Sequence, residues 1–270
     1  MAGRVVIRWF VMASVFAAST GFARAPSSTA TCVVIYDVQA GTTDRRGAAC
    51  ETRLSPASTF KIPHALVALE TGVVTAATVE KWDGTPHPAQ PSWDRDHTVL
   101  SAMKPSVVWF FQRIAPRIGA ERMHAWLQMN EYGNADTSGP VTEYWLNGRL
   151  RISPDEQVRF LRRFYSDELP IAAAHLAAVR GALEQKPGTV ENARGITVLD
   201  AAWPAGTTLN AKTGATTIAD GQGVSWLVGR LSAGGHVYIF AGAAWSKGGV
   251  DTLAGAGAAI RAFKERKLFR

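Results

Sequence analysis

Apolar positions along the chain change their period twice. The stretch from Thr31 to Asp37 is rich in β-branched and apolar residues, which is typical of a strand, and Gly41 and Gly47 follow as turn formers. From Ser58 to Glu70 the apolar residues recur at helical spacing, and Gly72 provides a stop signal. The chain therefore begins with strands and continues into a helix.

The middle of the chain, roughly Trp82 to Gln185, is rich in helical periodicity. One of its helices is supported by a capping box, because Ser153 and Glu156 flank a proline at the first helical position. The expected helices are Val107 to Ala115 before Pro116, Ala120 to Met129 before Gly133, and Pro154 to Tyr165.

From Gly195 onward the pattern returns to strands. Val224 to Val228 and Val237 to Phe240 are separated by a glycine turn and predict a hairpin. A final amphipathic stretch, Thr252 to Phe269, predicts a helix that Gly255 and Gly257 weaken. These elements predict an α+β fold, an antiparallel sheet flanked by helices with an inserted helical lobe. We expect one domain over residues 26–270, with a sheet lobe of about 26–80 plus 195–270 and a helical lobe of about 81–194.

The first 25 residues have the pattern of a signal peptide. Arg4 and Arg8 precede the apolar run from Trp9 to Ala18, and Ala23-Arg24-Ala25 offers small residues for cleavage. The run is shorter than the roughly 20 residues of a membrane span. We expect a periplasmic or secreted protein without stable membrane insertion after cleavage; the alternative is an uncleaved N-terminal anchor.

Composition and charge exclude several classes of protein. Hydrophobic residues make up 47% of the 270 and charged residues 19%, which is ordinary globular composition. Three of the +7 formal charges lie in the export segment, leaving +4 without a basic stripe, so we expect no nucleic-acid partner. The six histidines show no metal-ligand spacing and no phosphate-binding glycine loop occurs, so we expect no metal and no nucleotide. The sequence indicates no oligomeric state.

Cys32 and Cys50 are the only cysteines of the chain. Export to an oxidising compartment would favour a disulfide between them, which could staple a hairpin. Two buried free thiols are the alternative.

Ser58-Thr-Phe-Lys61 is the strongest chemical signal. Residues three apart share a helix face, so the lysine amine can reach the serine hydroxyl, and the start of a helix favours a developing oxyanion. A second match, Ser101 to Lys104, is followed by Pro105, which disfavours helical geometry, and we interpret it as coincidence. The alternative for Ser58 is a helix N-cap.

Three further motifs follow in order. Ser106-Val-Val108 and the loop Tyr132-Gly-Asn134 lie in the middle of the chain, and Lys212-Thr213-Gly214 follows a probable strand, where the small glycine would let a substrate approach the backbone. A serine motif S-x-x-K, a middle serine motif and K-T-G in this order are the signature of serine β-lactamases and penicillin-binding proteins.

With these motifs, and with Trp145-Leu146 and Trp226 to Gly229, the chain resembles the class D (oxacillinase-type) serine β-lactamases over most of its length. The family's middle motif is S-x-V with a later Y-G-N, which matches here. The resemblance implies the serine β-lactamase and penicillin-binding protein fold and a β-lactam substrate, penicillins first.

The resemblance also implies residue roles. Ser58 would form an acyl-enzyme, and Lys61 would react with carbon dioxide to become N6-carboxylysine, the general base; no other cofactor is implied. Burial against Phe60, Val108 and Trp145 would favour the neutral amine that this modification needs. Trp145 would donate its indole N–H to the carbamate. Ser106 would relay a proton to the leaving nitrogen, and Lys212 would support that step and attract the substrate carboxylate. The backbone N–H groups of Ser58 and Ala215 would form the oxyanion hole. Substrate binding would fall to Val108, Tyr132, Thr213, Gly214 and Ala215.

One departure concerns the arginine that many family members carry near the start of the C-terminal helix. No arginine occurs here between Asp251 and Arg261, so Thr213, Lys212 or Lys247 would have to compensate. Two other functions use the same fold, a penicillin-sensing domain that is acylated without efficient turnover and a cell-wall DD-peptidase. We expect the hydrolase, because an export signal and no preceding membrane domain are seen.

Overall fold

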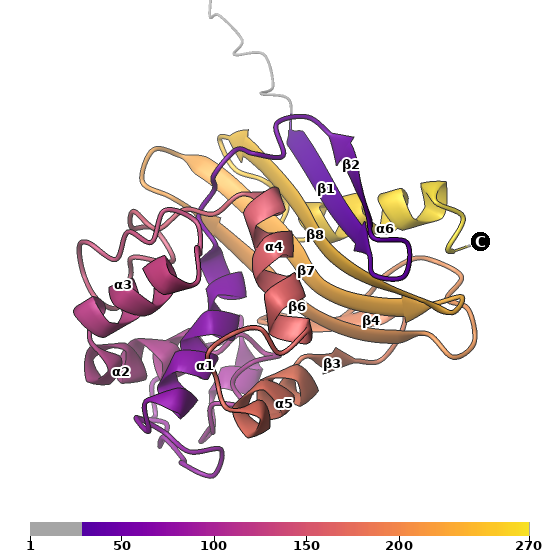
Figure 1. The fold of residues 1–270 in the computed structure, drawn as a ribbon. Coiled ribbons are helices and arrows are strands. Elements are labelled where there is room, and N and C mark those ends of the chain that lie inside the picture. Colours follow the sequence, from indigo (N-terminus) through magenta and orange to yellow (C-terminus); the bar gives the residue numbers. More distant parts are fainter. Residues whose placement is uncertain (1–28, 270) are drawn as a thin grey trace, which may run out of the picture.

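A six-stranded antiparallel sheet organises the structure, a computed structural model that describes residues 29–269 (Figure 1). Its strand order is β2-β1-β8-β7-β6-β3, so the first strand of the described chain pairs with the last. A separate two-stranded ribbon, β4-β5, completes the strands. Their bounds are β1 Ala30–Asp37, β2 Thr42–Gly47, β3 Glu184–Gln185, β4 Thr189–Asn192, β5 Gly195–Val198, β6 Thr208–Thr217, β7 Gln222–Ala233 and β8 His236–Lys247.

Helices cover both faces of this sheet (Figure 1). Along β1, Val34 joins the core shared with α1, α2 and α4, whereas Val33 and Ile35 join the core under α6, because successive strand residues point to opposite faces. The helices are α1 Lys61–Glu70, α2 Val108–Ile118, α3 Ala120–Met129, α4 Pro154–Tyr165, α5 Ala173–Ala182 and α6 Ala254–Glu265, with 3₁₀ turns η1 Ala57–Phe60 and η2 Pro91–Trp93.

The predicted elements are confirmed with some changes of extent. Helices α3 and α4 have the predicted bounds, and the capping box of Ser153 and Glu156 is present. The end predicted before Pro116 is wrong: α2 continues to Ile118 and stops at Gly119, whose φ is 86°. A proline in the last turn removes only one hydrogen bond of the helix. Helix α5 was not predicted, and both hairpin strands are longer than expected, each having 12 residues.

Gly255 has a low helix propensity, but the close packing of α6 on the sheet requires a residue without a side chain at this position. A Cβ atom at this position would lie 2.5 Å from the Ser225 carbonyl oxygen of β7. The glycine therefore lets the first turn of α6 approach the sheet closely.

Two helices pack against elements of the lobe opposite to the one that their place in the chain predicts. Helix α4, from the segment expected to form the helical lobe, packs on β8 and β1, whereas α1 packs beside α2 and α5. The predicted signal peptide, residues 1–25, lies outside the described residues. Within residues 29–269, no helix combines the length and the apolar character that crossing a membrane requires.

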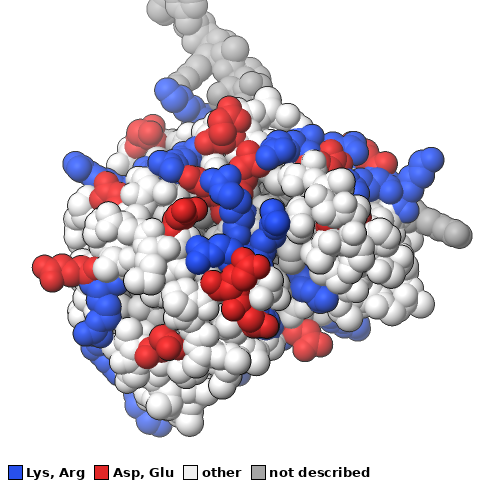
Figure 2. Space-filling view, in the orientation of Figure 1, with Lys and Arg blue, Asp and Glu red and all other residues white. Residues whose placement is uncertain are grey.

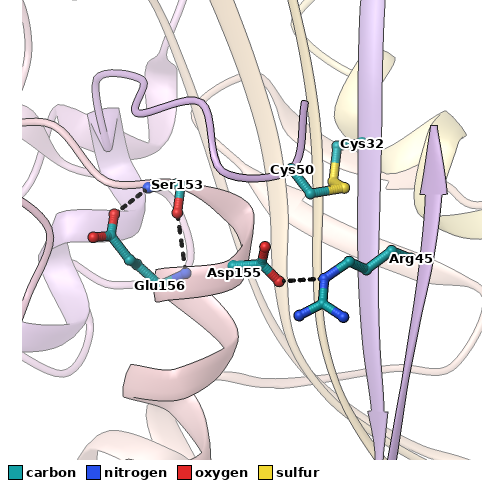
Figure 3. The surroundings of a disulfide bond; sticks show 6 residues. All are labelled: Cys32, Arg45, Cys50, Ser153, Asp155 and Glu156. Carbon is teal, nitrogen blue, oxygen red and sulfur yellow. Dashed lines mark hydrogen bonds and ion pairs between the residues drawn. A yellow bond between two sulfur atoms is a disulfide. The ribbon is translucent and has the colours of Figure 1, made fainter. Parts of the chain in front are cut away.

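Cys32 and Cys50 form a disulfide in the structure. Cys32 lies in β1 and Cys50 lies beyond β2, so the bond joins the β1-β2 hairpin to the segment that leads to η1 (Figure 3). Close by, Arg45 of β2 pairs with Asp155 at the start of α4 at 2.8 Å. The alternative of two free thiols is thus not what the structure contains.

Candidate active site

Ser58 lies in η1, immediately before α1 begins at Lys61. Lys61 Nζ donates to Ser58 Oγ at 3.0 Å, so the two side chains meet as their spacing predicts. The N-cap alternative for Ser58 is wrong, because the caps of η1 and α1 are Pro56 and Phe60. Ala57, just before the serine, has a φ of 47°, a costly conformation for a residue with a Cβ atom. The backbone is therefore held in an unusual conformation next to Ser58.

The Lys61 side chain is fully buried. Its Nζ lies 5.2 Å from the centre of the Phe111 ring, a neighbour that the sequence did not indicate. Burial lowers the pKa of Lys61 well below its ordinary value, and the charge of Lys212 lowers this pKa further. In this position the neutral amine of Lys61 is favoured over the charged ammonium ion, and a neutral amine can accept a proton.

Ser106 and Lys212 are 106 positions apart in the sequence and meet in the structure. Lys212 Nζ donates to Ser106 Oγ and, at 3.0 Å, to the carbonyl oxygen of Thr213. Ser106 has a φ of 59°, so its backbone too is unusual. Burial lowers the pKa of Lys212 to about 7, against a weaker effect of Glu191 that raises this pKa. Lys212 is buried and is not among the residues that line the cleft, so its attraction of a substrate carboxylate stays a prediction.

Trp145 packs behind Lys61 among aromatic rings. Its ring stacks on Phe60 at 5.8 Å and meets His64 edge-on at 5.1 Å. The Trp145 indole N–H and both ring nitrogens of His64 are buried and have no hydrogen-bond partner among residues 29–269. Burial lowers the pKa of His64 to about 3, so this ring is neutral near pH 7. Unpaired donors of this kind are unfavourable unless an acceptor occupies the space beside them.

A cleft of about 240 Å³ opens over Ser58 and Ser106. Several residues predicted to bind substrate line it: Val108, Thr213, Gly214 and Ala215. The Lys-Thr-Gly motif lies inside β6 and does not follow a strand. A Cβ atom at position 214 would lie 3.1 Å from atoms of Pro56 and Thr59, so the glycine also allows β6 to pack closely against η1.

Arg194 is a cleft residue that the sequence did not indicate. It lies in the turn between β4 and β5, beside Asn192 and Ala193, which also line the cleft. Asn192 Oδ1 accepts a hydrogen bond from the Arg194 backbone N–H at 2.8 Å and fixes the turn. The side chain of Arg194 is exposed. Its position on a hairpin distant in sequence from every motif explains why spacing could not reveal it.

Two expected substrate contacts are not present. Tyr132 is fully buried, packs edge-on against Phe60 and Phe160, and does not line the cleft, so its assignment to substrate binding is wrong. Lys247 ends β8 and is not a lining residue either. The second serine-lysine match is not helical, and Ser101 Oγ accepts from the Thr98 backbone N–H instead.

No cluster of three or more potential metal ligands occurs in the part of the chain that the structure describes. The residues assembled at the cleft are a serine, two buried lysines and a second serine. This set is suited to acyl transfer, because it supplies a nucleophile, an adjacent base and a route for a proton to a leaving group.

Comparison with known proteins gives a consistent picture. Residues 13–264 match the family described as the penicillin binding protein transpeptidase domain. The chain is 36% identical over 204 residues to β-lactamase OXA-5 of Pseudomonas aeruginosa, covering 74% of this chain and 69% of that protein. It is 34% identical over 193 residues to regulatory protein BlaR1 of Bacillus licheniformis, covering 70% of this chain but 29% of that protein. Among solved structures, class D β-lactamase BAT-2 has a TM-score of 0.74 and 32% identity, covering 90% of this chain and 93% of that chain.

Proposed function

Because the chain belongs to the class D β-lactamases, which are hydrolases, we propose that it opens the amide of the β-lactam ring in penicillins through an acyl-enzyme on Ser58. The contact of 3.0 Å between Lys61 Nζ and Ser58 Oγ carries this proposal. The Ser58 hydroxyl gives its proton to the base on Lys61, and its oxygen attacks the lactam carbonyl carbon. Ser58 lines the cleft, so a lactam bound there can reach its hydroxyl oxygen.

Protonation of the leaving nitrogen completes ring opening. Ser106 Oγ gives its proton to the lactam nitrogen and receives one from Lys212, whose pKa of about 7 suits proton transfer near neutral pH. The backbone N–H groups of Ser58 and Ala215 stabilise the oxyanion of the tetrahedral intermediate. Water then hydrolyses the ester and regenerates Ser58.

The residues around Lys61 fit carbon dioxide as a modifying group. A carbamate on Lys61 would supply a carboxylate base beside Ser58. The neutral amine that carbamate formation needs is favoured by the burial of Lys61. The Trp145 indole N–H, and the N–H of a neutral His64, are donors without acceptors that could hold the carbamate oxygens. Lys61 would then be N6-carboxylysine in the active protein.

Arg194 replaces the missing arginine as the anchor of the substrate carboxylate in this proposal. A guanidinium keeps its full charge at every working pH and pairs with a carboxylate through two hydrogen bonds. Lys212 is buried behind Ser106, so it is less suited to this task. Thr213 lines the cleft and would add a hydroxyl donor.

A second candidate function is a penicillin-sensing domain that is acylated but turns over slowly. The alignment with regulatory protein BlaR1 favours it, since this relative covers 70% of the chain. We prefer the hydrolase and place it in the periplasm or outside the cell, as the export pattern of residues 1–25 suggests.

Intact-protein mass spectrometry after addition of a penicillin, with and without bicarbonate, tests the proposal while the lactam absorbance is followed. We expect a transient adduct on Ser58, rapid substrate loss and stimulation by bicarbonate. Lys61→Ala should abolish hydrolysis. A long-lived adduct without turnover would identify a sensor or a DD-peptidase, and no adduct at all would refute the acyl-enzyme.

A further inference from the structure

A second and larger cavity, of about 520 Å³, lies between α4 and strands β1, β7 and β8. None of its lining residues lines the catalytic cleft. Figure 2 shows Lys and Arg side chains gathered at the middle of this face, with Asp and Glu side chains beside them, in the region that α4 occupies in Figure 1. We call this cavity the arginine groove after Arg159, Arg162, Arg163 and Arg230, which line it.

Sheet register and helix period together bring these arginines to one place. Arg230 of β7 pairs with Ile239 of β8, which pairs with Tyr36 of β1, so the three form a row across the sheet. On α4, positions 159, 162 and 163 are three and four apart and therefore share one helix face. The groove has an apolar and aromatic floor and a basic wall.

The arginines of the groove lack the close carboxylate partners that other arginines of the protein have. Arg163 donates only to neutral oxygens at 3.2 to 3.4 Å. These are the backbone and side-chain carbonyl oxygens of Asn130 and the backbone carbonyl oxygen of Glu168. The Arg162 guanidinium lies 3.7 Å from the centre of the Tyr36 ring. Within residues 29–269, no ion pair involves Arg162, Arg163 or Arg230.

Arg159 approaches Glu156 only at 3.9 Å, and Arg53 already holds that carboxylate at 2.6 Å. Elsewhere, Arg45 and Arg180 contact carboxylates at 2.8 and 2.7 Å. Two acidic residues, Glu131 and Glu168, also line the groove, so its four arginines exceed its carboxylates by two. The groove has a local excess of positive charge that the protein itself does not neutralise.

A buried hydroxyl adds a second kind of donor. Tyr165 lines the groove, and its hydroxyl oxygen is buried with no hydrogen-bond partner among the described residues. Burial raises the pKa of Tyr165 above its ordinary value, so the hydroxyl keeps its proton. A buried donor of this kind is unfavourable until an acceptor reaches it.

We propose that the arginine groove binds a phosphate monoester that carries an apolar group, either a small phosphorylated molecule or the headgroup of an anionic phospholipid. A phosphate monoester carries a charge of about −1.5 to −2, which balances the excess of two, and guanidinium groups bind phosphate oxygens in pairs. The Tyr165 hydroxyl is a further donor to the phosphate. The apolar group lies on Val237 and Ile239 of the floor.

Calorimetric titration with phenyl phosphate tests this site, and vesicles that contain phosphatidic acid, whose headgroup is a phosphate monoester, form the second arm, with phosphatidylcholine vesicles as their control. We expect phenyl phosphate to bind more tightly than inorganic phosphate. Arg230→Ala should raise the dissociation constant about tenfold, as expected for losing one charged hydrogen-bond donor. Arg122→Ala removes an exposed arginine of α3 outside the groove and should change nothing.

The two sources give different results. Binding of phenyl phosphate without binding of phosphatidic acid vesicles indicates a small molecule, and vesicle binding that Arg230→Ala abolishes indicates a lipid. Hydrolysis of penicillin by Arg230→Ala should keep the wild-type rate, which also checks folding. Should that variant not fold, Tyr165→Phe, which removes only the hydroxyl, must weaken binding by a factor of about three or more. Failure of both probes to bind wild-type protein, or an equal loss in Arg122→Ala, overturns the proposal.

Discussion

The buried indole N–H of Trp145 is the residue-scale feature that links the packing behind Ser58 to turnover. Trp145→Phe keeps an aromatic ring beside Phe60 and His64 but removes the donor. We expect acylation to persist and deacylation to slow by a factor of about 10 to 100, the equivalent of one hydrogen bond to a charged group. The fraction of acyl-enzyme at steady state, measured by mass spectrometry, reports this change.

Trp126 offers a matched control for that prediction. Its indole N–H is also buried without a partner among the described residues, but its ring packs on Phe160, away from Lys61. Trp126→Phe should leave deacylation unchanged. Equal slowing of acylation and deacylation in Trp145→Phe would contradict the assigned role.

Lys212 should make stability depend on pH. Burial lowers its pKa to about 7 in the folded protein, whereas the unfolded chain has the ordinary value of 10.5. Between these values the unfolded state binds more protons, so the free energy of unfolding rises with pH in this window, by about 1.4 kcal/mol per pH unit for this one group. Below pH 7 the folded state is protonated as well, and this contribution to the slope disappears.

Urea unfolding at several pH values between 7 and 10 measures the slope. Lys212→Met retains the length of the side chain without the titrating group, so its slope should be smaller than that of the wild type by about 1.4 kcal/mol per pH unit. Identical slopes in the two proteins would show that Lys212 titrates normally in the fold.

At the scale of elements, the β4-β5 turn gives the cleft a cation that no catalytic motif contains. Arg194→Ala should raise the KM for a penicillin about tenfold, because a charged pair at the cleft is lost, and should change kcat little. Steady-state kinetics on the penicillin and on its methyl ester, which has no carboxylate charge, separate this effect from a general disturbance. The ester should be hydrolysed by both proteins with the same KM.

Lys247→Ala is the control for Arg194, since Lys247 is not among the residues that line the cleft. Its KM for the penicillin should equal that of the wild type. A larger rise in KM for Lys247→Ala than for Arg194→Ala would return the anchor to the C-terminal end of β8.

Elements with strong local signals could be predicted from the sequence, and the others could not. Helix α4 has a capping box and a proline at its first position, so its bounds follow from local chemistry. Helix α5 begins after Ala172, without a capping side chain, and its apolar residues are only weakly concentrated on one face. The length of β7 and β8 depends on their pairing with each other and with β1, which no local window contains.

The same division applies to the candidate site. The contact between Ser58 and Lys61 follows from a spacing of three residues, whereas that between Ser106 and Lys212 joins distant segments and was expected only from the family resemblance. The assignment of Tyr132 to substrate binding is wrong because a sequence motif does not show whether a ring faces the cleft or packs in the core against Phe60, as this one does.

At the scale of the whole molecule, the sheet is complete only when strands from the two ends of the described chain pair, because β1 lies between β2 and β8. The Cys32–Cys50 disulfide ties this N-terminal hairpin to the segment before η1 across 18 positions. In the loop-entropy account, a bond closing a loop of this length stabilises the fold by about 3 kcal/mol, mainly by restricting the unfolded chain. We therefore expect the double variant Cys32→Ala with Cys50→Ala to lose about that much free energy of unfolding in urea.

Penicillin hydrolysis by this double variant at 25 °C should remain close to that of the wild type, since Ser58 and Lys61 are positioned by the core around Phe60 and Trp145. Wild-type protein treated with a thiol reductant should unfold at the urea midpoint of the double variant. A midpoint equal to that of the oxidised wild type would mean that the packing of β1 between β2 and β8 holds the hairpin without the bond.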